Sequence, residues 1–209
     1  MRKDSKLVLT MKLACGILIA ASITLSMILM LTGDYAVERY PLSKIGYANR
    51  GIFALWGIAT GMAVYLNMKL LASRLQFKNR IFESLLVVGC LMTLVTVTIM
   101  GYGRIERPIH VASAMGFGIF NIVCVMWLMI LKARRKNKSL TAVYITLIMI
   151  CAVIFIFTSA QMGWFTALTQ VLVINVCLVI MFISNFIERW PDNEVVDISE
   201  EDAYTHNKT

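Results

Sequence analysis

The sequence predicts an all-α, polytopic membrane protein, folded as a single bundle of six transmembrane helices. The first observation is composition: 59% of the 209 residues are hydrophobic and 15% are charged, with a mean hydropathy of +0.75, whereas about a quarter of the residues in a soluble domain are charged. The second is the spacing of the charges, which leaves long apolar runs between them. The third is length, because six helices of roughly 20 residues with short connections fill such a chain.

Runs without charge mark the spans, because a charge near the bilayer centre costs roughly 2.5 to 3.5 kcal/mol on insertion scales. Five runs lack Asp, Glu, Lys and Arg: 13–33, 51–68, 84–103, 108–131 and 139–187. The last is too long for one helix, since at about 1.5 Å per residue it would extend more than twice the roughly 30 Å hydrocarbon core. The polar segment 159–164 contains Gly163 and marks a turn. The predicted helices therefore lie near 9–32, 49–72, 81–102, 108–131, 139–160 and 164–187.

Basic residues predict the orientation. Fifteen of the 20 Lys and Arg residues fall before the first span, between spans two and three, between spans four and five, and after the last span. The positive-inside rule then places both termini in the cytoplasm. The basic start followed by an apolar run could also be a signal peptide, but no clear cleavage site precedes Asp34, so an uncleaved first helix is expected.

The chain turns acidic from Glu188 onward, with seven carboxylates against two cations. A segment of this charge with few apolar residues buries too little surface to fold by itself. The sequence therefore predicts a transmembrane domain over residues 1–188 and an acidic, disordered cytoplasmic tail over residues 189–209. A docking peptide for a protein partner is the alternative interpretation of the tail.

Residue types that bind metals and cofactors are scarce and scattered. The two histidines form no local cluster with cysteines or carboxylates. The five cysteines all lie in apolar runs and none belongs to a CxxC pair: Cys15, Cys90, Cys124, Cys151 and Cys177. We therefore expect neither a metal site nor a cofactor. Nucleic acid is not an expected partner either, because the basic residues flank spans and lack interleaved aromatic side chains.

Polar residues within the spans are candidates for a site, because such residues usually face other helices or a wet cavity. Asn121 in the fourth span and Asn175 in the sixth lie near mid-membrane. Helical spacing places His110 and Asn121 on one face, which is expected to point inward. Hydrogen bonding between helices is the simpler interpretation, and a substrate path is the alternative. Gly57 and Gly61 form a GxxxG pair that is expected to pack within the bundle rather than in a dimer interface.

The start of the fourth span combines features of an anion site. Pro108 suits a first helical turn, and a helix beginning there directs unpaired backbone N–H groups and its positive dipole end out of the membrane. Arg104, Arg107 and His110 lie close to this start, and they form the predicted site for the phosphate or carboxylate of a lipid headgroup. In the alternative interpretation the arginines are interface anchors or ion-pair partners, and His110 is a neutral residue bonded to a neighbouring helix.

Three short elements carry a resemblance to a known family. They are PLSKIG over 41–46, GIF over 51–53, and PIH over 108–110 followed by Ala114 and Phe117. Over roughly residues 8–188 the chain resembles the bacterial six-span domain-of-unknown-function family 998, which is similar in layout to the Frag/DRAM/Sfk membrane proteins. The resemblance implies a six-helix bundle in a bacterial plasma membrane and some link to lipids, without an established reaction.

The leading functional hypothesis is a non-enzymatic membrane protein that binds lipid or a protein partner. Its sequence has no recognisable nucleotide site, metal set or nucleophile motif. A small transporter or transporter accessory subunit is the first alternative, although no internal repeat supports it. A membrane-embedded hydrolase or transferase using His110 is the second. Membrane lipids are the expected partners, and a protein partner or homo-oligomer is a further possibility.

Overall fold

The computed structural model describes residues 2–32, 36–99, 103–135, 138–162 and 166–188. Within these ranges the chain is helical and contains no strand. In chain order, the elements are α1 (Arg2–Thr32), α2 (Leu42–Ala48), α3 (Arg50–Arg74), α4 (Arg80–Thr98), α5 (Glu106–Arg135), α6 (Lys138–Met162), α7 (Ala167–Phe182) and the π-helical turn η1 (Ile183–Ile187). The predicted tail, 189–209, lies outside the described residues.

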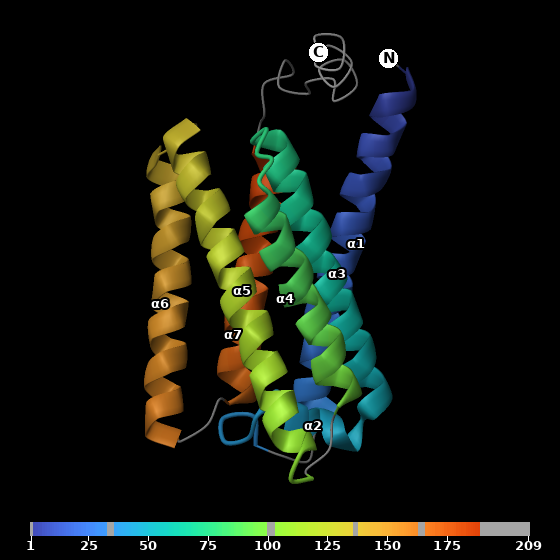
Figure 1. Cartoon of the computed structure of the whole chain (residues 1–209), viewed down its shortest axis with the longest axis vertical. Coiled ribbons are helices and arrows are strands. Elements are labelled where there is room, and N and C mark those ends of the chain that lie inside the picture. The colour runs from blue at the N-terminus through green and yellow to red at the C-terminus, as the bar shows by residue number, and fades with distance from the viewer. Residues whose placement is uncertain (1, 33–35, 100–102, 136–137, 163–165, 189–209) are drawn as a thin grey trace, which may run out of the picture.

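Six of these helices are long and apolar enough to cross a membrane, and they run side by side as one bundle (Figure 1). The chain is therefore an integral membrane protein of six spans, as the sequence predicts. One end of the bundle holds the start of α1, the end of α7 and the α3–α4 and α5–α6 connections, and we call it the basic end. The opposite end holds the short α2, and we call it the α2 end. Which end faces the cytoplasm stays a prediction.

The helix boundaries differ most from the predicted ones at the first, third and fourth spans. The first helix begins at Arg2 instead of 9. The third span ends at Thr98 instead of 102. The fourth span is longer than its charge-free run and extends from Glu106 to Arg135, because Glu, Lys and Arg are good helix formers and reach the interface with their long side chains. The helix α2 is an addition that the charge pattern does not predict.

Helix α3 is the centre of the bundle and packs against α1, α4, α5 and α7. Its GxxxG pair lies against α4: a Cβ at Gly57 would collide with Val97, and one at Gly61 would sit 3.6 Å from Thr93. The missing side chains let the two backbones approach closely. The prediction that this pair packs within the bundle is confirmed.

Two apolar clusters fill the interior. The larger lies towards the basic end around Met68, Leu71, Phe82 and Leu128. The smaller lies at the α2 end, where Leu42 and Ile45 of α2 pack with Phe53. Gly46 is required there, because a Cβ at this position would overlap the side chain of Phe53. The PLSKIG and GIF elements therefore form one packing seam.

Helix α6 stands at the periphery and packs against α5 and α7. Its buried side chains are Thr141, Tyr144, Ile148 and Cys151, and none of its described residues beyond Cys151 is buried. In Figure 1, α5 and α6 lie together at the basic end and diverge towards the α2 end.

Candidate functional site

His110 closes the end of α4. Its Nδ1 lies 2.9 Å from the carbonyl oxygens of both Thr96 and Ile99. Since carbonyl oxygens only accept, Nδ1 is the donor, and it serves carbonyls that the end of a helix leaves without intrahelical partners. Thr96 donates to Ser113 over 2.9 Å, and Ser113 donates to the carbonyl of His110 over 2.9 Å. One ring nitrogen of the predicted headgroup residue thus joins α5 to α4.

Arg104 and Arg107 are exposed at the α2 end, around the start of α5. The amide of Arg107 donates to the carbonyl of Gly103 over 3.1 Å. Helix α5 begins at Glu106, so its first turn carries a carboxylate that offsets part of the positive helix end. The structure therefore brings the two arginines and His110 to the same end of α5, with an acidic neighbour that the predicted site did not include.

Asn121 and Asn175 are not brought together. Asn121 is 7% exposed; its Nδ2 donates to the carbonyl of Phe117 over 2.7 Å, and its Oδ1 faces Cys90 of α4. Asn175 donates to Ser26 of α1 over 3.3 Å, and its buried Oδ1 has no hydrogen-bond partner. His110 and Asn121 both contact α4, so the prediction that their shared face points inward is confirmed.

A buried lysine lies at the basic end, where sequence reasoning treated it as a loop cation. The side chain of Lys132 is 0% exposed. Its Nζ donates to Glu188 over 2.5 Å and to Ser184 over 2.7 Å, and it lies 4.8 Å from the centre of the Tyr144 ring. The Tyr144 hydroxyl donates to the same Glu188 oxygen over 3.0 Å. The Glu188 carboxylate therefore links α5 and α6 to the end of α7.

The π-helical turn η1 positions this group. Its wider turn is closed by the Glu188 amide, which donates to the carbonyl of Ile183 over 3.0 Å. Asn185, in the same turn, donates to the Asn67 side chain of α3 over 3.2 Å. Periodicity is the signal that could have found Lys132, because it follows the buried Leu128 by four residues on the same face of α5.

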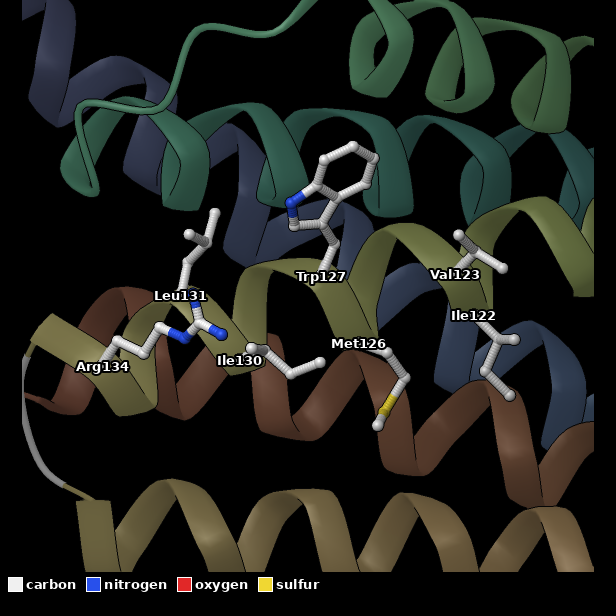
Figure 2. Close-up of a pocket in the computed structure, with 7 residues that line it drawn as sticks. All are labelled: Ile122, Val123, Met126, Trp127, Ile130, Leu131 and Arg134. Atoms are coloured by element: carbon white, nitrogen blue, oxygen red, sulfur yellow. The ribbon is translucent and has the colours of Figure 1, made fainter.

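A groove runs along α5 towards the basic end (Figure 2). It encloses about 490 Å³ and is lined by Ile122, Val123, Met126, Trp127, Ile130, Leu131 and Arg134. Trp127 is held in place by ring contacts to Phe77 and Phe82, at centroid distances of 5.6 and 6.3 Å. The exposed guanidinium of Arg134 stands at the basic end of an otherwise apolar strip.

The described residues hold no group of side chains suited to bind a metal ion. Among the described residues no three His, Cys, Asp or Glu side chains gather where they could hold a metal ion. His110 uses Nδ1 on backbone carbonyls and contacts no hydroxyl or thiol nucleophile through that atom. Comparison with models of known protein families, with curated proteins and with solved structures finds no match for this chain. The function of the chain therefore has to be inferred from its own structure.

Proposed function

We propose that this chain is a non-enzymatic membrane protein that binds a membrane lipid along α5. The main observation in support of this proposal is the groove along α5. It lies on a membrane-spanning helix, so acyl chains are the molecules around it, and this open groove, with a volume of about 490 Å³, has room for part of one. The resemblance to domain-of-unknown-function family 998, with its link to lipids, supports the same proposal.

The groove suits a lipid at both of its ends. Ile130 and Met126 present flexible apolar surface for an acyl chain, and Trp127 supplies a rigid wall. Arg134 lies in the last turn of α5, where a helix end meets the membrane interface. A guanidinium binds phosphate oxygens in a bidentate manner, so it favours an anionic phospholipid headgroup at that depth.

The proposed location is a bacterial plasma membrane with the basic end in the cytoplasm, supported by the charge asymmetry. Single cysteines at Ser43 and Lys78, each introduced into a cysteine-free background, should react with a membrane-impermeant maleimide from opposite sides of sealed cells. Labelling of both from outside would contradict the orientation.

Native mass spectrometry of protein purified in mild detergent tests the lipid site. Arg134→Gln should lower the co-purified anionic phospholipid several-fold, and Ile130→Trp should displace lipid by filling the groove. The matched controls are Arg80→Gln, an exposed cation at the same end but off the groove, and Leu91→Trp, an exposed apolar position on α4. Equal lipid content in all five proteins would contradict the proposal, and a shift to defined dimers in place of lipid would favour the homo-oligomer.

A further inference from the structure

Helices α5 and α6 are arranged differently at the two ends of the bundle. The two helices diverge towards the α2 end (Figure 1), and the buried side chains of α6 all lie between Thr141 and Cys151. Beyond Cys151, apolar side chains such as Ile156 and Phe157 are exposed. The α6 helix is therefore anchored at the basic end and separated from α5 at the other.

A small apolar crevice lies between α5 and α7, over α3. It has a volume of about 60 Å³, and its walls include Gly118 and Ile122 of α5, Ile174 and Cys177 of α7, and Met68 of α3. Ile122 also lines the α5 groove, so the two spaces meet at that residue. A Cβ placed on Gly118 would have no heavy atom within 4 Å, so the space beside this glycine is open.

The crevice presents an apolar surface although Asn121 is part of its wall. The amide nitrogen of Asn121 is bonded to Phe117, and its oxygen faces the thiol of Cys90. A polar ligand group would have to compete with these contacts, whereas a hydrocarbon chain would not. The space therefore fits the end of an acyl chain and not a headgroup.

The depth of the crevice matches one leaflet of a bilayer. Gly118 follows Arg107 by 11 residues on one continuous helix, which is about 16 Å at roughly 1.5 Å per residue. Half of the hydrocarbon core is about 15 Å. A lipid whose phosphate meets the exposed Arg107 would bring the end of an extended chain to the level of Gly118.

We infer that the crevice receives the end of one acyl chain of an anionic phospholipid from the leaflet on the α2 side, with the headgroup at Arg107 and Arg104. This inference rests on the proposed lipid-binding function and adds a second site, in the opposite leaflet from Arg134. The chain enters beside Gly118, where the space is open. Glu106 in the same turn opposes the anion, so the site needs the apolar crevice as well as the arginines.

A photoreactive lipid tests the inference. The protein is placed in nanodiscs containing phosphatidylglycerol that carries a diazirine at the end of one chain, and peptide mass spectrometry locates the adducts after irradiation. Adducts should concentrate at residues 118–122 of α5 and 173–177 of α7. Gly118→Leu should reduce them several-fold by filling the open space, whereas Gly51→Leu, the same change at another open glycine, should leave them unchanged.

A charge comparison tests the headgroup. The same diazirine on phosphatidylcholine should label the crevice several-fold less, and Arg107→Gln should abolish that difference while the melting temperature stays the same. Adducts spread evenly over lipid-facing residues, or no effect of Gly118→Leu, would overturn the crevice site. Equal labelling by both lipids would overturn its anion preference. The proposed function fails separately, through an unchanged lipid content in the Arg134→Gln protein.

Discussion

The basic end and the α2 end of the bundle are closed by different kinds of interaction. At the basic end, side chains meet side chains: Lys132 reaches Glu188 and Ser184, and Tyr144 reaches the same carboxylate. At the α2 end, main-chain groups of a loop and of a helix start also bond to one another directly. The amides that begin α7 donate to loop carbonyls, Ala167 to Tyr40 over 2.7 Å and Leu168 to Val37 over 3.1 Å.

The difference follows from what each end must join. At the α2 end the short α2 lies against α7, and the amide of Leu42 donates to the Gln170 side chain over 3.1 Å. Loop and helix ends supply unpaired backbone groups there, and they satisfy one another. At the basic end α5 and α6 lie together, and Glu188, which follows η1, bonds to Lys132 of α5 and to Tyr144 of α6. The backbone hydrogen bonds at the α2 end do not require particular side chains, whereas the hydrogen bonds at the basic end do.

The largest expected effect is the loss of the buried lysine. Lys132→Met leaves the Glu188 carboxylate, 15% exposed, without its cation, and should cost about 3 kcal/mol of stability, near the lower limit for breaking a buried ion pair. Thermal unfolding in mild detergent measures the loss. The double variant Lys132→Met/Glu188→Gln should recover most of it, and a double variant as unstable as the single one would show that packing, not charge, holds this end.

A smaller effect is expected at the α2 seam. Gly46→Ala places a methyl group against the Phe53 ring and should cost about 1 to 3 kcal/mol through overpacking. Gly51→Ala, where the space is open, is the control. Adding Phe53→Leu to Gly46→Ala should restore part of the melting temperature. If Gly46→Ala behaves like Gly51→Ala, α2 does not seal this end as described.

Removal of the His110 imidazole should lower the stability of the protein by about 1 kcal/mol. His110→Ala leaves the carbonyls of Thr96 and Ile99 without this donor, and a typical net hydrogen bond contributes about 0.5 to 1.5 kcal/mol. The melting temperature should fall slightly while anionic lipid content stays the same. Loss of lipid with no loss of stability would instead make His110 part of the headgroup site.

The smallest effect belongs to the surface ion pair of the basic end. Lys69 and Glu83 meet at 2.7 Å, but their side chains are 38% and 49% exposed. Solvent screens such pairs, so Lys69→Gln should cost less than about 1 kcal/mol. The effect should also fade as salt is raised. A loss comparable to that of Lys132→Met would remove the distinction between buried and exposed charge at this end.

Much of the fold could be predicted from the sequence because the bilayer imposes a one-dimensional rule. Charges are excluded from the core, so their spacing marks five apolar runs, the last of which is too long for one helix. The polar segment near 159–164 divides that run and predicts the break between α6 and α7. The same rule misled in one respect. The sequence places Lys132 in a loop and counts Glu188 with the acidic residues that lead into the tail, because a charge at the end of a span looks the same whether solvent or another helix meets it.

The candidate sites also combine features that the sequence determines with features that only the fold determines. The sequence alone determined that His110 and Asn121 share a face of α5, since both the period of a helix and their separation are local properties. Only the tertiary structure decided that this face meets α4, that one ring nitrogen of His110 binds backbone carbonyls, and that the space beside Gly118 is open. These facts depend on which helices become neighbours. Neighbours are chosen by side-chain shape summed over whole helices, which no single spacing in the sequence encodes.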